Sequence, residues 1–201
     1  MGRMTAKTLR EAERQYPGDA FYASIATISE DEYWQKVVDS GWLEGMPGPV
    51  AERMRAELFD TFAAAPEQAM ESLCSISVDH TAFAESYTAV LQRLREASWG
   101  VFEPGNVSET EADDGSISLS FTHMGRIYSA RLSSARVDDT KILKLVNRAL
   151  RDGGAERQFA ILCRGVLKDE RIRLVFVSEK AFYKGEELGL FPADDANAFF
   201  R

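Results

Sequence analysis

The chain has 201 residues, a formal net charge of −8, and 45% apolar against 28% charged side chains. A chain of this length and composition can bury a core as one domain or as two smaller ones, which excludes wholesale disorder. No stretch approaches the roughly 20 apolar residues that span a bilayer, and no apolar run of a secretory signal follows the N-terminus. We therefore expect a cytoplasmic protein that makes no contact with membranes.

The charge is distributed unevenly along the chain. Residues 1–125 carry a balance of −12, whereas residues 126–173 carry a balance of +6. An acidic protein repels nucleic acid and attracts basic protein surfaces, so we expect a protein partner and no direct binding of nucleic acid. The basic residues fall on several predicted strands and one helix, and we interpret them as a solvated surface, partly paired with acids of the N-terminal half.

The first two helices are predicted from residues that commonly begin or end a helix. A short helix is expected over 5–15, stopped near Pro17-Gly18. Ser29 and Glu32 have the spacing of a capping box, which begins a helix that Gly41 is placed to end.

Three further helices are expected before residue 100. Apolar residues recur at every fourth position from Val50 to Phe62, which predicts one stripe on a helix. Pro66 suits the first position of the next helix, which could reach Ile76. Asp79 is then placed to cap a longer helix that ends near Gly100.

Beyond residue 100 the period of the apolar residues changes to that of strands. Asp114-Gly115 is a strong hairpin signal, and serines alternate with apolar residues over 116–121, as in a half-buried strand. Met124-Gly125 predicts a second turn, and the chain returns along 126–132.

A helix and two strands follow. The helix has an apolar stripe from Ile142 to Leu150 and ends at Gly153-Gly154. Strands are expected over 158–164 and 171–177, before a last helix capped by Ser178. Four basic residues of the helix that ends at Gly153-Gly154 lie largely off its apolar stripe: Lys141, Lys144, Arg148 and Arg151.

These elements predict an α+β fold, with a helical N-terminal half followed by a mostly antiparallel sheet in the order β-β-β-α-β-β-α. The period change near residue 100 suggests a helical lobe over 1–100 and an α+β lobe over 101–201. No flexible linker separates the two lobes, so we expect them to form one compact unit.

No catalytic motif is present. The sequence has no G-x-S-x-G elbow, no phosphate-binding loop and no dinucleotide fingerprint, and its histidines and cysteines lack the spacing of a zinc site. We interpret His80 and His123 as structural or solvated residues, and Cys74 and Cys163 as free core thiols, although a disulfide stays open. The prediction is a non-enzyme without catalytic residues, cofactor or metal.

One acidic segment is distinctive. No Lys or Arg occurs between Arg95 and Arg126, and four acids surround the predicted hairpin tip: Glu109, Glu111, Asp113 and Asp114. One interpretation is a solubilising hairpin whose charges discourage edge-to-edge pairing. The other is a surface that binds a basic partner.

Two segments resemble a known kind of protein. They are Phe121-Thr122-His123-Met124-Gly125-Arg126-Ile127-Tyr128, and the helix Ile142-Leu143-Lys144-Leu145-Val146-Asn147-Arg148-Ala149-Leu150. With the closing segment Glu187-Leu188-Gly189-Leu190-Phe191-Pro192, they are similar to small bacterial immunity proteins encoded beside polymorphic toxins. The resemblance covers residues 115–193 and implies a cytosolic inhibitor that binds one cognate toxin and has no catalysis of its own.

Three hypotheses follow. The first is an immunity protein that binds and occludes a toxin with a basic surface, through the four acids at the hairpin. The second is a secretion chaperone or adaptor for an effector, which should be a homodimer with an exposed apolar groove. The third is an enzyme, which should show a concave pocket with polar groups converging around His80 or His123.

Overall fold

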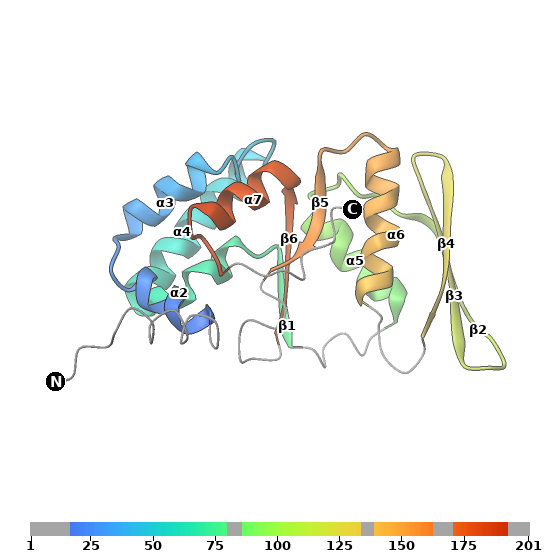
Figure 1. Cartoon of the computed structure of the whole chain (residues 1–201). Helices are drawn as coiled ribbons and strands as arrows, with labels where there is room; N and C mark the ends of the chain where they lie inside the picture. The colour runs from blue at the N-terminus through green and yellow to red at the C-terminus, as the bar shows by residue number, and fades with distance from the viewer. Residues whose placement is uncertain (1–16, 80–85, 134–138, 163–170, 193–201) are drawn as a thin grey trace. The chain divides into compact units, whose positions relative to one another are not determined.

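The computed structural model describes residues 17–79, 86–133, 139–162 and 171–192. Contacts divide the chain into two compact units, each built from segments far apart in the sequence. The first holds helices from the N-terminal part together with the last helix, and the second holds all the described strands and two helices (Figure 1). This division does not coincide with the expected boundary at residue 100.

The first unit is helical. Its elements are α2 (Pro17–Ile25), α3 (Glu30–Asp39), α4 (Gly48–Ala64), the 3-10 helix η1 (Pro66–Leu73) and α7 (Glu179–Glu187). The expected cap is confirmed, because the Ser29 hydroxyl accepts a hydrogen bond of 3.2 Å from the backbone N–H of Glu32. Gly41 follows the end of α3 with φ of 78°, a conformation that favours glycine.

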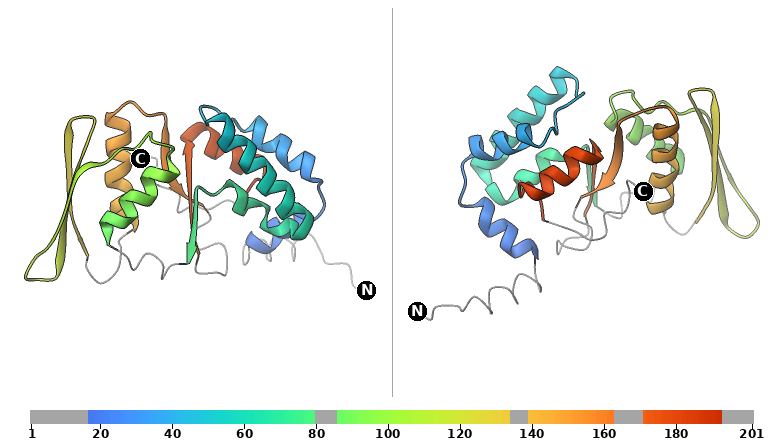
Figure 2. Two further views of the ribbon diagram at one scale, coloured as in Figure 1. Left: turned by 180° about the vertical axis from the view of Figure 1, so that it is seen from behind. Right: turned by 45° about the horizontal axis from the view of Figure 1, so that its top comes forward.

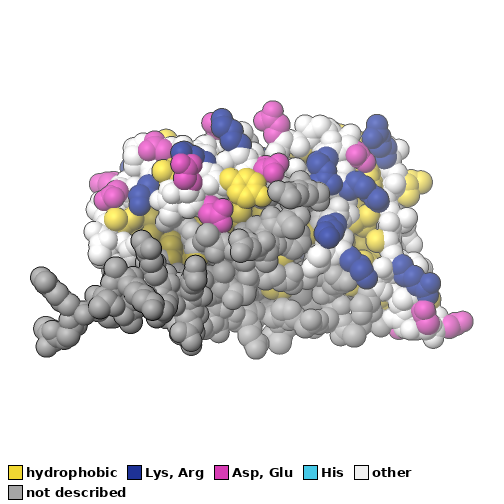
Figure 3. Space-filling model, viewed as in Figure 1, with side chains coloured by type: hydrophobic (Ala, Val, Ile, Leu, Met, Phe, Trp, Pro, Cys, Tyr) yellow, Lys and Arg dark blue, Asp and Glu magenta, His cyan; other side chains and the backbone are white. Residues whose placement is uncertain are grey.

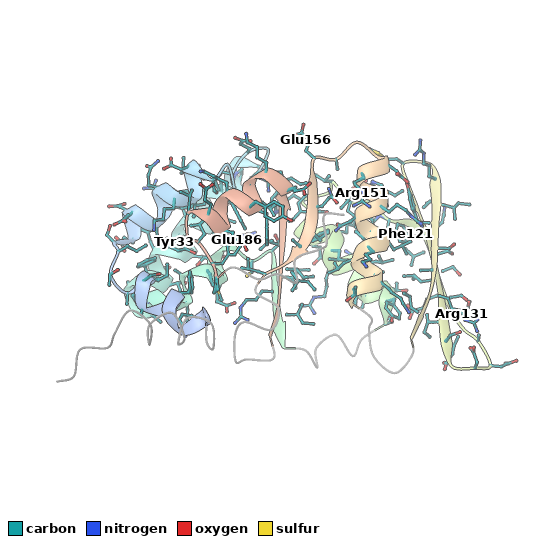
Figure 4. The ribbon with its side chains drawn as sticks, viewed as in Figure 1. Tyr33, Phe121, Arg131, Arg151, Glu156 and Glu186 are labelled. Atoms are coloured by element: carbon teal, nitrogen blue, oxygen red, sulfur yellow. The ribbon has the colours of Figure 1, made fainter. Side chains whose placement is uncertain are left out.

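Aromatic side chains join α7 to the N-terminal helices. The Tyr33 hydroxyl donates a hydrogen bond of 2.7 Å to the backbone carbonyl of Leu190, and the rings of Trp42 and Phe191 lie 5.8 Å apart. A Cβ at Gly185 would lie 3.2 Å from the Trp42 ring, a tight contact that a larger residue could make only if its neighbours shifted. These contacts hold α7 against helices that precede it by more than a hundred residues (Figure 4 labels Tyr33).

The second unit contains two antiparallel three-stranded sheets. One has the order β1-β6-β5, from Ile76–Asp79, Arg171–Ser178 and Arg157–Ile161. The other is a meander, β2-β3-β4, from Gly105–Glu111, Ser116–His123 and Arg126–Ser133. Helices α5 (Tyr87–Ala97) and α6 (Asp139–Asp152) lie between the two sheets (Figures 1 and 2). The core therefore fills two interfaces, one on each side of the helical layer.

The α+β class and the antiparallel pairing are confirmed. Both predicted turns of the meander are present, with Gly115 at φ 75° and the Met124-Gly125 pair at φ 48° and 77°. The helix stripe from Ile142 to Leu150 is buried as expected. Among the described residues, no helix has the length and apolar character needed to cross a membrane.

The start of α5 differs from the sequence prediction. Asp79 does not cap this helix but ends strand β1, and Ile76 begins that strand rather than ending the preceding helix. The helix begins after Ser86, whose hydroxyl accepts a hydrogen bond of 3.2 Å from the Ala89 N–H. A strand of four residues has too few alternations to be recognised, and its partner β6 lies about a hundred residues later.

Several predictions fall outside the described residues. They concern the helix over 5–15 and the residues His80 and Cys163.

Helix α6 is fixed to strand β5 by a buried amide. The Asn147 side chain is 0% exposed; its Nδ2 donates to the Phe159 carbonyl at 2.7 Å, and its Oδ1 accepts from the Phe159 N–H at 2.8 Å. Strand β5 is an edge of its sheet, so the amide satisfies backbone groups that a further strand would otherwise pair.

We predict that Asn147→Ala destabilises the protein by about 2–4 kcal/mol, because it leaves the buried N–H and C=O of Phe159 without a partner. The measurement is the free energy of unfolding in a urea titration. Gln92→Ala, at an exposed site on α5, is the control and should change stability by less than about 0.5 kcal/mol. An equally small loss for Asn147→Ala would show that the two hydrogen bonds contribute little.

Candidate functional site

The sheet β2-β3-β4 has one face toward the core and one face away from it. Leu119, Phe121 and Tyr128 point into the core, so the alternate residues of each strand lie on the opposite face, called here the outer face. The outer face includes a shallow depression of about 430 Å³. Its hydroxyl groups come from all three strands: Ser108, Thr110, Ser118, Ser120 and Ser129.

The pairing register arranges these hydroxyls in rows across the sheet. Ser108 lies opposite Ser120, which lies opposite Ser129. In the next row Thr110 and Ser118 are followed by Arg131. The outer face is thus polar and flat, and it offers hydroxyl donors and acceptors without a deep pocket.

One end of the outer face is apolar. Ile127 is 77% exposed, the largest exposure among the described large apolar side chains. Met124, in the β3–β4 turn, is 71% exposed but lies on the other side of the sheet, because a Cβ at Gly153 after α6 would lie 2.8 Å from its Sδ. Ile127 is paired with Thr122 at the end of the hydroxyl rows. Exposed aliphatic side chains beside a polar surface are typical of protein-binding sites.

Glu109, the first of the four predicted site acids, does not lie at the hairpin tip. Its carboxylate accepts hydrogen bonds from the Thr88 N–H at 2.9 Å, the Thr88 hydroxyl at 2.7 Å and the Tyr87 N–H at 3.2 Å. These donors are the first residues of α5, so Glu109 caps that helix from the neighbouring strand. Partial burial raises the pKa of Glu109, but the hydrogen bonds from Thr88 and Tyr87 outweigh it, and the pKa lies below its usual value.

Asp114 also has partners within the chain. Its carboxylate forms an ion pair with Arg131 and accepts hydrogen bonds from the hydroxyl and the N–H of Ser116, at 2.7 and 3.1 Å. The hydrogen bond from Arg131, followed by those from Ser116, lowers the pKa of Asp114 well below its usual range. Asp114 therefore shapes the turn, as an acid at this position often does.

The remaining two acids are exposed at the hairpin. Glu111 ends β2 and Asp113 lies in the turn, and neither makes a hydrogen bond or ion pair with the described residues. Figure 3 shows the acidic side chains at this end of the meander, beside basic ones. The predicted acidic site thus contains two acids directed to solvent and two with structural partners.

His123 lies in the core rather than in a pocket. It is 4% exposed, its ring lies 5.5 Å from that of Phe102, and its Nδ1 is 3.3 Å from the Glu103 carbonyl and 3.4 Å from the Glu103 nitrogen. A Cβ at Gly153 would lie 3.3 Å from its Nε2, so the ring packs under the turn that follows α6. It does not line the depression on the outer face or the groove described next.

A second concave feature lies between β4 and α6, and is called here the basic groove. Its volume is about 330 Å³, and four of its lining side chains are basic: Lys141, Lys144, Arg148 and Arg151. Ser129 and Ala130 line it from β4, and Leu145 contributes its apolar part. Figure 3 shows Lys and Arg side chains gathered over α6, and Figure 4 labels Arg151 there.

The described residues contain no group of three or more His, Cys, Asp or Glu side chains placed to hold a metal ion. Cys74 is half-buried. The chemistry offered by these sites is therefore hydrogen bonding by hydroxyls, apolar contact, and charge of both signs.

The chain was compared with protein-family models, with curated proteins and with solved structures, and none of these comparisons gave a match.

The sequence predicted some of these residues better than others. It identified the hairpin acids, but their neighbours in space decide which of them are directed to solvent. The spacing of Lys141, Lys144, Arg148 and Arg151 already places them on one side of a helix. Their position beside the edge of β4 depends on how α6 packs, for which the sequence carries no local signal.

We predict that Glu109→Ala destabilises the protein by about 1 kcal/mol at pH 7, the usual effect of losing a helix cap. Glu111→Ala, two residues away on the same strand, is the control and should have little effect. Because the pKa of Glu109 is lowered in the folded state, its contribution is present above the unfolded value near 4.3 and is lost as pH falls through the folded value.

Urea titrations of wild type and both variants at pH 7 and at pH 3 measure this effect. The difference between wild type and Glu109→Ala should shrink at the lower pH. A difference that is the same at both values would mean that the carboxylate charge is not what holds the start of α5.

Proposed function

We propose that this protein works by binding another protein, and that it is an immunity protein that neutralises a cognate bacterial toxin. The observation that carries the proposal is the outer face of β2-β3-β4, a flat surface of hydroxyls that ends in the exposed side chain of Ile127. The resemblance of residues 115–193 to immunity proteins supports the same reading, since these residues include β3, β4 and α6.

The outer face combines one exposed aliphatic side chain with polar groups around it. Binding energy in protein interfaces is concentrated in a few well-packed anchors, surrounded by polar contacts that exclude water. Ile127 suits the role of an anchor, and the serine and threonine rows suit the surrounding contacts. Because each strand is held in register by its neighbours, the face loses little conformational freedom on binding.

The hairpin acids have a narrower role in this proposal than the sequence suggested. Glu111 and Asp113 extend into solvent at the end opposite Ile127, where they can attract a basic partner surface. Glu109 and Asp114 are engaged within the chain and are not assigned to the interface. A toxin that acts on nucleic acid would present such a basic surface, because its substrate is anionic.

We predict that Ile127→Glu weakens binding of the cognate toxin by at least about 30-fold, as expected for the loss of a central anchor worth about 2 kcal/mol. The toxin is the domain that this hypothesis requires to be encoded beside the gene for this chain. Its affinity is measured by titration calorimetry, and its neutralisation by growth of cells that produce both proteins. Val38→Glu replaces an apolar residue exposed on α3 and is the control, with no expected effect.

One outcome would contradict the immunity role, and another would contradict only the assignment of the outer face to the interface. Cells that die despite producing this chain with the neighbouring toxin domain would count against the immunity role. Full protection and unchanged affinity in Ile127→Glu would keep the role but remove the outer face from the interface.

We predict that Glu111→Gln combined with Asp113→Asn lowers the association rate at low salt and flattens its salt dependence, with little change in the dissociation rate. Surface plasmon resonance at two ionic strengths measures both rates. Glu52→Gln combined with Glu57→Gln, on exposed positions of α4, is the charge-matched control. An unchanged rate and salt slope in the hairpin variant would show that these acids do not face the partner.

A further inference from the structure

Helix α6 is buried over more than half of its circumference. Its buried residues cover an arc of roughly 200°, because the helix packs against a sheet on each side. The opposite side carries the four basic residues of the basic groove, all exposed and spaced at i, i+3, i+7 and i+10. Asp152, the last residue of α6, is exposed on the same side and accepts a hydrogen bond of 3.2 Å from the Tyr128 hydroxyl, but it is not among the groove-lining residues. A row of four positive charges, with this one acid at its end, therefore follows the helix in a protein that is acidic overall.

The other wall of the basic groove is a strand edge. Strand β4 pairs with β3 on one side, and in the described part of the chain no strand pairs with its other side. The two-residue turn at Met124-Gly125 makes His123 and Arg126 the first hydrogen-bonded pair. Hydrogen-bonded and non-hydrogen-bonded pairs then alternate along the two strands, which makes Ser120 and Ser129 a non-hydrogen-bonded pair. The backbone N–H and C=O of Ser129 therefore point away from β3 and toward the edge that no described strand pairs.

The two other edges near this site are protected. Asn147 satisfies the edge of β5 with its amide, as described above. Strand β2 carries Glu109 and Glu111 and has an irregular register between Gly105 and Ser108, two devices that discourage pairing with another strand. Among the described residues, no side-chain amide is hydrogen-bonded to the edge of β4 in this way, and hydroxyl and basic groups surround the edge.

We propose that the basic groove binds an extended acidic segment of a protein partner, which adds to the edge of β4 as a fourth strand. Backbone hydrogen bonds to β4 would hold the segment, as in other cases of strand addition. Its side chains would alternate, with carboxylates directed to Lys141, Lys144, Arg148 and Arg151 and small polar side chains directed to the outer face. This site goes beyond the proposed toxin-binding surface, since it takes a ligand of opposite charge.

Charge alone would also attract nucleic acid, but the geometry favours a peptide. The groove combines four cations with a strand edge that no described strand pairs. Backbone N–H and C=O groups at a strand edge match another strand rather than a phosphate backbone. The lining residues include no aromatic side chain on which bases could stack.

The test uses the full-length protein and two fluorescent nine-residue peptides, with binding measured by fluorescence anisotropy at low salt. In the first peptide Glu alternates with Thr. In the second Glu alternates with Pro, which keeps the charge and removes backbone donors. We expect the first peptide to bind at least about tenfold more tightly than the second, because it alone can complete the hydrogen-bond ladder.

Two variants test the two walls of the groove. Lys144→Glu combined with Arg148→Glu reverses the charge of the helix wall and should weaken the Glu-Thr peptide by at least about tenfold. Ser129→Pro removes the outward N–H of β4 and leaves the hydrogen bonds between β4 and β3 in place. It should lower the affinity of the Glu-Thr peptide to that of the Glu-Pro peptide. Lys36→Glu combined with Lys180→Glu, on α3 and α7, is the charge-matched control and should bind as wild type does.

Circular dichroism and urea titration establish that each variant is folded. If Ser129→Pro does not fold, the comparison of the two peptides on wild type and on the charge-reversal variant still decides the question.

Equal binding of the two peptides to wild type overturns strand addition. Absence of binding overturns the site itself. A single-stranded oligonucleotide that binds more tightly than Glu-Thr and depends on Lys144 and Arg148 shows a nucleic-acid site and overturns the peptide proposal. Sedimentation that reveals a dimer, lost in Ser129→Pro, shows that a second copy occupies the edge and also overturns it.

Discussion

The second unit depends on the packing of α6 between two sheets, and the bidentate contact of Asn147 with Phe159 fixes that packing. Apolar contacts alone would let a helix slide or rotate by small amounts, since Ile, Leu and Val side chains pack in many similar ways. An amide that must meet one N–H and one C=O in the interior has a single acceptable position. The rotation of α6 is therefore set, and with it the direction of every other side chain on the helix.

This rotation explains how the two charged surfaces arise. Once Asn147 faces β5, the residues Lys141, Lys144, Arg148 and Arg151 must lie away from the core and beside β4. The acids of the meander lie elsewhere, with Glu109 bound to the start of α5 and Asp114 to Arg131. The basic groove and the two exposed acids Glu111 and Asp113 are thus separate surfaces of one unit, and each could serve a different partner or a different part of the same one.

The extent to which the sequence predicted this structure follows from the range of each interaction. Caps, turns and stripes are local, and Ser29, Met124-Gly125 and the Ile142–Leu150 stripe were predicted correctly for that reason. Strand β1 was missed, because its identity comes from pairing with β6 rather than from its own four residues. The role of Glu109 was missed likewise, since a strand residue that caps a helix 21 residues earlier leaves no pattern in the sequence. The binding role itself stays a prediction.

The order of segments along the chain has a consequence for synthesis on the ribosome. The hydrogen bond between Phe176 and Ser75 joins residues 101 positions apart, and that between Tyr33 and Leu190 joins residues 157 positions apart. Neither unit can complete its core until the last quarter of the chain has been made, so the aromatic surfaces of Tyr33 and Trp42 await α7 during translation. At roughly 5–20 residues per second, this wait lasts about ten seconds or more, long enough for a nascent-chain chaperone to bind. A ribosome stalled near residue 175 would consequently hold a chain with exposed core residues in both units.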